Sequence, residues 1–493
     1  MTSPQLGAAE ELAGELEVRG GAGGVSARLD DLECTGALLC RLAVALTEAA
    51  GTVLAVAGDP ALAATGVVAP ATYLRAEASL AVAVGGPHGA VALAVRIGAT
   101  GAALAATARA YRQVEASVGA GLRGVRLAAG WVAAPWLAAG GAAVLQLGCV
   151  VALVGGRRVP ATRVGAVTLR LLSRHGGVFQ SAVGTLPGAV AAVVSVVPAA
   201  GPLWAGASHG RWPPSSMRDV ARLAGASGRF GPWLREPVAV RVQVASPGHA
   251  VAAPSGLAGV VAAIPQAEIG ADPRIRVERV TAPDGGRSWV VGIPGTASWR
   301  PVPGRTPFDL SGNVHVMAGE RTAAQEAVVR AMRVAGVGPR DPVLLAGHSQ
   351  GGMVAGVLAA DERFRREFRV THVVTVGSPM GSIPVPDDVQ VLALEHTDDL
   401  VPTLDGTPNP DRARWVTVRR AATSDPALAD VAARYPVVTH LLPAYERTAA
   451  LVDASDDPSL RAFRGTLSPF LERPGAEAVA IDVEAERAIR SRP

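Results

Sequence analysis

The sequence predicts an α/β domain with a mostly parallel sheet flanked by helices, preceded by an all-α region that is rich in apolar residues. Two patterns lead to this prediction. Before about residue 210, Ala, Leu and Val recur at helical spacings of three and four residues. After about residue 237, short apolar runs of β type alternate with helical ones. We therefore expect an apolar α-helical domain at 1–235, an α/β domain at 236–455 and a C-terminal helical tail at 456–493.

The composition limits the classes of protein to consider. The 493 residues suffice for about two to four domains, and 49% hydrophobic with 18% charged residues excludes disorder for most of the length. All 46 basic residues are Arg and lie scattered, so the net charge of +4 does not indicate a nucleic-acid partner. The three cysteines are too few for a disulfide scaffold and contain no CxxC pair: Cys34, Cys40 and Cys149. We expect neither a metal nor an organic cofactor.

The first part of the chain is expected to be helical. Apolar spacing predicts helices within 36–118, with turns at 58–66 and 84–89, where Gly and Pro gather. The first twenty or so residues carry acidic side chains where a Sec signal peptide has a basic segment, so we do not expect such a signal.

Two uncharged runs follow, at 127–156 and 176–208. Each exceeds the roughly 20 residues that cross a bilayer, but both are rich in Gly and Ala and are interrupted by Pro. Three interpretations remain open: a pair of buried helices, a membrane hairpin across 127–208, or a surface that inserts reversibly. In a membrane hairpin, the Arg-rich loop at 157–174 would stay on the cytoplasmic side.

A Pro- and Gly-rich stretch at 211–237 is expected to be a linker to the α/β domain. Beyond it, seven strands are predicted at 238–245, 275–280, 288–293, 342–347, 370–377, 389–395 and 414–418. Helices are predicted between them, notably at 321–336 and 351–361. The acidic residues from about 455 onward indicate an exposed helix.

One motif indicates nucleophilic catalysis. Serine needs a base to remove its proton and donors to stabilise the oxyanion that its attack creates. A GxSxG turn between a strand and a helix presents serine for this purpose, and residues 347–351 read Gly-His-Ser-Gln-Gly in that context. A second match around Ser208 lacks both a strand and a helix, so we attribute it to chance and predict Ser349 as the nucleophile.

The acid and the base should follow the serine in that order. Asp398 and Asp399 come directly after the strand at 389–395, at the sheet edge where α/β proteins hold their ligands. Only one of the two can orient an imidazole. His440 follows the last predicted strand at the start of a helix, which fits the base. The other histidines considered fit it less well by position: His315, His348, His372 and His396.

These residues resemble a known family. The segments VLLAGHSQGGMVAGVLAAD and HTDDLVPTL, with a downstream His, resemble the α/β-hydrolase superfamily and, within it, class 3 type lipases and related actinobacterial serine esterases. The DLVP match favours Asp399 as the acid, whereas a looser superfamily pattern favours Asp398. The resemblance covers about 238–452. It also implies oxyanion donors in the backbone N–H groups of Thr296 and Gln350, with the Thr296 hydroxyl as a helper.

The sequence departs from those lipases at two points. Pro294 stands where they often carry Arg, and no lid helix is evident, which leaves acyl-chain preference and interfacial activation open.

The resemblance implies a serine hydrolase that cleaves carboxylic esters through an acyl-Ser349 intermediate, with an ester or lipid-like small molecule as substrate. The alternatives are an acyltransferase or thioesterase with the same triad, a non-catalytic secretion or envelope protein, and a toxin delivered to other cells. Residues 111–115 match the YxxxD/E pattern of type VII secretion substrates, although an ordinary solvated helix end explains them as well. We expect membrane association through the N-terminal half, or export without a Sec signal.

Overall fold

The computed structural model describes residues 16–154, 176–195, 213–267 and 272–488, and gives only the backbone for 135–154, 176–178, 193 and 436. The chain divides into two compact units. One comprises Val25–Leu122, and the other joins the residues up to Gly24 with Arg123–Pro493. This division differs from the expected boundary near residue 236, because residues 123–235 group with the sheet.

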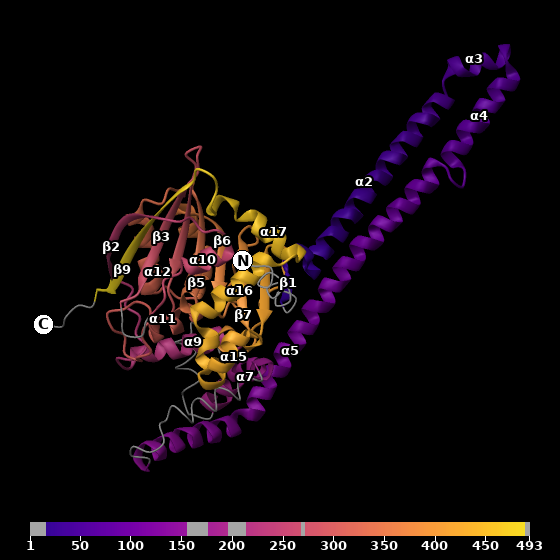
Figure 1. Cartoon of the computed structure of the whole chain (residues 1–493). Helices are drawn as coiled ribbons and strands as arrows, with labels where there is room; N and C mark the ends of the chain where they lie inside the picture. The colour runs from indigo at the N-terminus through magenta and orange to yellow at the C-terminus, as the bar shows by residue number, and fades with distance from the viewer. Residues whose placement is uncertain (1–15, 155–175, 196–212, 268–271, 489–493) are drawn as a thin grey trace. The chain divides into compact units, whose positions relative to one another are not determined.

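The helical unit contains α2 (Val25–Ala57), α3 (Pro60–Val68), α4 (Pro70–Gly85) and the first part of α5 (Ala90–Val154) (Figure 1). Helices were expected here, but the turn predicted at 58–66 is mostly helix α3. The Asp59 side chain caps α3 by accepting the Ala61 N–H at 2.8 Å, and Pro60 occupies the first turn. The Gly and Pro of this stretch therefore mark a helix start.

Helices α2 and α5 pack closely through two glycines. A Cβ built at Gly36 would lie 2.6 Å from the Gly101 carbonyl oxygen, and one built at Gly101 equally close to the Gly36 oxygen. Further along, Arg112 on α5 donates to Glu33 on α2 at 2.6 Å. The 111–115 stretch thus lies inside a long helix, not at the solvated helix end considered above.

The second unit is built on a nine-stranded sheet of order β1-β8-β7-β6-β5-β4-β3-β9-β2. Strands β4 to β8 run parallel, whereas β1, β2, β3 and β9 join antiparallel. All seven predicted strands are present. The strands are β1 (Glu17–Gly20), β2 (Val240–Val251), β3 (Arg274–Thr281), β4 (Arg287–Ile293), β5 (Pro342–His348), β6 (Arg369–Val376), β7 (Gln390–His396), β8 (Trp415–Arg420) and β9 (Glu477–Arg487).

Helices cover both faces of this sheet. Alternate strand residues point to opposite faces, so Val343 and Leu345 join one apolar core while Leu344 and Ala346 join the other. The first core also holds residues of α11, α12, α13 and α14, and the second those of α10, α16 and α17. The helices of this unit are α7 (Gly176–Ser195), α9 (Met217–Ala226), α10 (Leu257–Ala262), α11 (Leu310–Ala318), α12 (Ala323–Ala335), α13 (Gln350–Ala360), α14 (Glu362–Glu367), α15 (Pro426–Arg434), α16 (Leu442–Ala454) and α17 (Pro458–Thr466). The predicted α/β architecture is therefore present, with a mixed sheet.

The C-terminal tail was predicted wrongly beyond α17. Strand β9 lies inside the sheet, between β3 and β2, instead of forming an exposed helix. Its acidic residues face arginines of β3: Asp482 accepts from Arg276 at 2.9 Å and Glu484 from Arg274 at 3.1 Å. The acidic side chains of β9 therefore pair with arginines of a neighbouring strand, and they do not indicate a solvent-exposed helix.

The expected linker at 211–237 contains helix α9. Ser216 caps it, with its hydroxyl accepting the Asp219 N–H at 3.2 Å, and α9 packs against α11. Strand β1, which no sequence pattern predicted, pairs with β8 at the edge of the sheet.

The uncharged runs overlap the end of α5 and α7. A Cβ built at Gly130 would lie 2.1 Å from the Thr185 oxygen, and Val183, Ala189 and Ala191 are buried. The described side chains of this region are therefore mixed: these residues of α7 are buried, whereas Trp131 and Val132 on α5 are 46% and 76% exposed. Residues 155–175 and 196–208 of the proposed membrane hairpin, Ser208 among them, lie outside the described part of the chain.

Candidate active site

Ser349 occupies a strained turn between β5 and α13. Its φ of 54° and ψ of −116° make it one of two non-glycine residues with positive φ in the described chain. A Cβ built at Gly347 would lie 2.3 Å from the backbone of Gly351, and one at Gly351 would lie 2.2 Å from the Ile293 oxygen on β4. Both glycines of the motif are thus required by close backbone approach, as a nucleophile elbow demands.

The structure brings Ser349, His440 and Asp399 together. His440 Nε2 lies 3.0 Å from Ser349 Oγ, and its Nδ1 lies 2.7 Å from Asp399 Oδ2. With the proton on Nδ1, the imidazole donates to the carboxylate and accepts from the serine hydroxyl. Ser349 follows β5, Asp399 follows β7 and His440 precedes α16, so the three converge at the carboxyl ends of the parallel strands.

The choice between the two adjacent aspartates is decided by geometry. The Asp398 carboxylate accepts the backbone N–H groups of Ala422 at 3.0 Å and Thr423 at 2.9 Å, in the turn after β8. Asp399 instead faces His440, and its second oxygen accepts the Val401 N–H at 2.9 Å. Asp399 is therefore the residue that orients the imidazole.

Asp399 remains ionised although it is buried. Burial raises the pKa of this carboxyl, but the charge and hydrogen bond of His440, the Val401 N–H and the Tyr445 hydroxyl together lower it below its ordinary value. The side chain of His440 is 17% exposed, whereas that of Asp399 is 2% exposed. The pair thus offers a charged acid deep in the fold and a base that solvent can reach.

Two histidines that fit the base less well in the sequence lie beside the triad. His348 Nε2 is 2.7 Å from the carbonyl oxygen of His440, and His396 Nδ1 is 2.7 Å from that of Thr439. Burial lowers the pKa of His348 to about 3 and also lowers that of His396, so both rings are neutral N–H donors at neutral pH. Their hydrogen bonds fix the backbone at Thr439 and His440. His372 lies apart from the triad, bonded to Thr466 at 2.9 Å.

Sequence reasoning missed Tyr445. Its hydroxyl donates to Asp399 Oδ2 at 2.8 Å from the first turn of α16. The one available signal was position, because a side chain one turn after His440 can face back toward Asp399.

The predicted oxyanion donors lie next to the nucleophile. Gln350 is the first residue of α13, where a backbone N–H has no acceptor within the helix. Thr296 follows β4, and a Cβ built at its neighbour Gly295 would lie 3.4 Å from Ser349 Cβ. The Thr296 hydroxyl accepts from Asn313 Nδ2 at 2.9 Å. The side chain is thereby fixed, and the N–H remains the group that can serve the oxyanion.

A buried cluster of charged side chains supports the start of α11, beside Gln350. Arg487 on β9 donates to Asp309 at 3.0 Å and to Glu236 at 2.6 Å, and all three side chains are at most 3% exposed. Asp309 in turn caps α11, and its carbonyl accepts from the Gln350 side chain at 3.1 Å. The sequence did not indicate this support, because Arg487 lies in the segment that was expected to be an exposed helix.

An apolar helix lies beside the acid loop. Helix α7 packs against the short helix η3 (Val401–Thr403), which follows Asp399. A Cβ built at Gly406 would lie 2.9 Å from the Gly184 Cα, so the approach is close. The sequence had shown no obvious lid helix, and α7 contacts the loop that follows Asp399.

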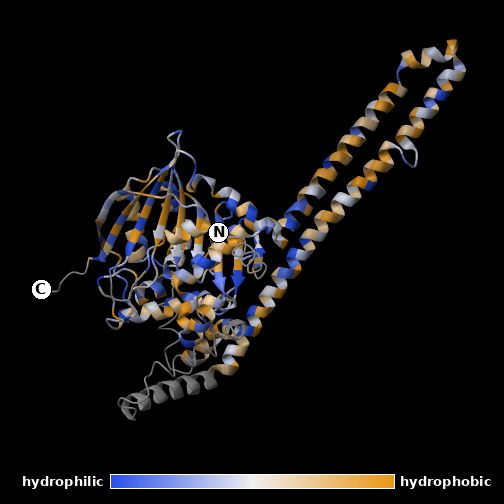
Figure 2. Cartoon of the chain, in the orientation of Figure 1, coloured by the Kyte–Doolittle hydropathy of each residue, from blue (hydrophilic) through white to orange (hydrophobic). Residues whose placement is uncertain are grey.

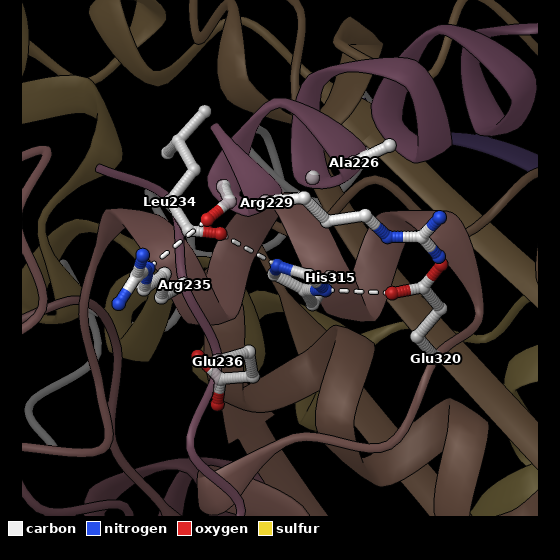
Figure 3. A pocket seen from close by; sticks show the side chains of 9 residues that line it. Ala226, Arg229, Leu234, Arg235, Glu236, His315 and Glu320 are labelled. Carbon is white, nitrogen blue, oxygen red and sulfur yellow. Dashed lines mark hydrogen bonds and ion pairs between the residues drawn. The ribbon is translucent and has the colours of Figure 1, made fainter. Parts of the chain in front are cut away.

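His315 lies in a separate pocket of about 390 Å³, lined by residues of α9, α11 and the segment between α9 and β2 (Figure 3). Its Nδ1 is 2.7 Å from Glu320 Oε2 and its Nε2 is 2.9 Å from the Leu234 oxygen. Both partners are acceptors, so the ring donates to both only when protonated. Burial lowers the pKa of His315, but these two hydrogen bonds and nearby carboxylates outweigh it and raise the pKa.

Comparison of the chain with family models, with curated proteins and with solved structures found no match.

Proposed function

We propose that this protein is a serine esterase of the α/β-hydrolase type. The observation that carries the proposal is the hydrogen-bonded chain from Ser349 Oγ through His440 to Asp399, with distances of 3.0 and 2.7 Å, on an elbow with positive φ. The order of the three along the parallel strands supports the same assignment.

The geometry suits acyl transfer in two steps. His440 Nε2 removes the proton of Ser349 as the oxygen attacks the ester carbonyl, and Asp399 stabilises the imidazolium. The N–H groups of Thr296 and Gln350 stabilise the tetrahedral oxyanion. His440 then protonates the leaving alcohol, which leaves an acyl-Ser349 ester. Water, activated by the same base, releases the acid and restores the serine.

A fluorophosphonate probe and p-nitrophenyl butyrate test this proposal. We expect the wild type to be labelled and to hydrolyse the ester, and Ser349→Ala to lose both. Ser208→Ala is the matched control, because it alters the other GxSxG match. Labelling that survives in Ser349→Ala would overturn the triad. Product analysis with added alcohols distinguishes hydrolysis from the acyltransferase alternative, and the rate of hydrolysis of an acyl thioester tests the thioesterase alternative.

We also propose that the helical unit binds a lipid bilayer. By length and composition alone, Val25–Ala57 and Pro70–Ala134 could each cross a membrane, and only 6% and 17% of their most apolar windows are buried. Between residues 42 and 95 the charged side chains are only Glu48, Asp59, Arg75 and Glu77. Figure 2 shows apolar residues along the length of these helices.

All-round apolarity favours lipid over a protein partner, because a helix that docks on a protein needs one apolar stripe. Among the large apolar residues of the described chain, the most exposed are Val67 and Val68 on α3, at 88% and 87%. This proposal shifts the membrane contact from 127–208 to the turn region of the helical unit.

Flotation with phosphatidylcholine and phosphatidylglycerol vesicles tests it. We expect the full chain to float and Val67→Glu/Val68→Glu to float about tenfold less, because a charge in hydrocarbon is costly. Val334→Glu is the control, because Val334 is an exposed valine on α12, in the unit that carries the sheet. If the double variant floats like the wild type, the lipid contact lies elsewhere. Self-association that the double variant abolishes, without flotation of the wild type, would indicate a second copy as the partner.

A further inference from the structure

Tyr445 contacts the acid of the proposed triad from helix α16. The side chain is completely buried, and its hydroxyl donates to Asp399 Oδ2 at 2.8 Å. The same oxygen accepts the N–H of His440 at 2.7 Å. The acid oxygen that holds the catalytic imidazole is therefore shared between two donors.

The tyrosine ring is itself held in place. It stacks on His396, with ring centroids 3.8 Å apart and an angle of 5° between the planes. His396 is fixed at both nitrogens, by the Thr439 carbonyl at 2.7 Å and the Thr448 hydroxyl at 2.8 Å, and its backbone N–H donates to the Tyr445 hydroxyl at 3.2 Å. Because Thr439 immediately precedes His440, this one cluster supports the acid and the base together.

We propose that Tyr445 is a positioning residue of the triad, which fixes the Asp399 carboxylate and limits how strongly Asp399 stabilises the protonated His440. The inference rests on the proposed esterase function and extends it to the control of the site. A second donor on Oδ2 draws negative charge from the His440 bond. When that donor is removed, more of the negative charge of the Asp399 carboxylate is available to the bond with His440. The imidazolium of His440 then forms more readily.

The titratable groups that face the Tyr445 hydroxyl and ring are Asp399, Glu395, His396 and His348. Burial, followed by the charge of Asp399 and the hydrogen bond to it, raises the pKa of Tyr445 well above its ordinary value, so the phenol remains a donor across the assay range. Burial also raises the pKa of Glu395, to about 7. A Glu395→Gln variant removes that titration from the profile and separates it from the Tyr445 effect.

The deciding variant is Tyr445→Phe, which keeps the ring and its stacking but removes the hydroxyl. We expect kcat for p-nitrophenyl butyrate to fall about ten- to a hundredfold with KM little changed, as for a lost hydrogen bond to a charged group. We also expect the midpoint of the acid limb of kcat/KM to move upward by about half to one pH unit. Rates are divided by the fraction of enzyme that the fluorophosphonate probe labels.

Phe463→Leu is the structural control, because Phe463 lies in the same apolar core as Tyr445. It should lower the melting temperature without moving the acid limb. An acid limb in Tyr445→Phe that matches the wild type overturns the positioning role and leaves the esterase proposal standing. Absence of probe labelling in the wild type overturns the esterase proposal and this inference with it.

Discussion

At the scale of single residues, the two adjacent aspartates contact different parts of the chain. Asp399 contacts the base, whereas Asp398 caps the turn after β8. We expect Asp399→Asn to lower kcat about a thousand- to ten-thousandfold, because the amide cannot stabilise the imidazolium. Asp398→Asn keeps an acceptor for the turn and should change kcat by less than about tenfold. Ester hydrolysis by both purified variants checks the ranking, and the opposite order would place the acid one residue earlier.

At the scale of elements, His315 joins α11 to the segment that leads from α9 to β2. The pKa of His315 is raised in the folded chain, so protonation of its ring stabilises the fold. This contribution to the free energy of unfolding is fully present below the unfolded pKa of about 6.5, and it is lost as pH rises through the folded pKa. We expect His315→Gln to lower the melting temperature by about 2 °C at pH 6, which corresponds to about 1 kcal/mol, and by much less at pH 9. Thermal unfolding at both pH values checks this.

The exposed His249 supplies the control for that measurement, through His249→Gln. A destabilisation by His315→Gln that is equal at the two pH values would mean that packing, and not the charged ring, joins these elements. The carboxylates that face the ring are those of Glu320 and Glu236. Both should therefore be kept intact in the variant.

The sequence predicted some strands of the sheet and missed others. Strands β2 to β8 were predictable because each is an apolar run bounded by turns, and the order Ser349, Asp399, His440 followed from the motif and the strand ends. Strand β9 was not, since its alternating acidic residues resemble a solvated helix until the arginines of β3 are placed opposite them. Tyr445 and Arg487 act on partners 46 and 178 residues away, a separation that no local pattern reveals.

At the scale of the whole molecule, the helical unit is an insertion in the sheet unit. The chain forms β1, continues through Val25–Leu122, and returns to the sheet unit from Arg123 onward. The proposed esterase site and the proposed lipid-binding surface therefore belong to different units, and every residue of the proposed triad lies beyond residue 340. Where a shortened chain begins should then decide whether the site survives.

A chain that begins at residue 213 retains α9 and Glu236, whereas one that begins at Pro237 loses both. Without Glu236, the buried Arg487 keeps only Asp309 as a carboxylate partner, and the loss of one member of a buried ion pair costs about 3–5 kcal/mol. That is a large part of the stability of an ordinary domain, about 5–15 kcal/mol. We expect the longer chain to be soluble and labelled by the fluorophosphonate probe, and the shorter one to be labelled weakly and to melt at a lower temperature. Equal labelling and equal melting temperatures would show that Glu236 and α9 are dispensable to the hydrolase core.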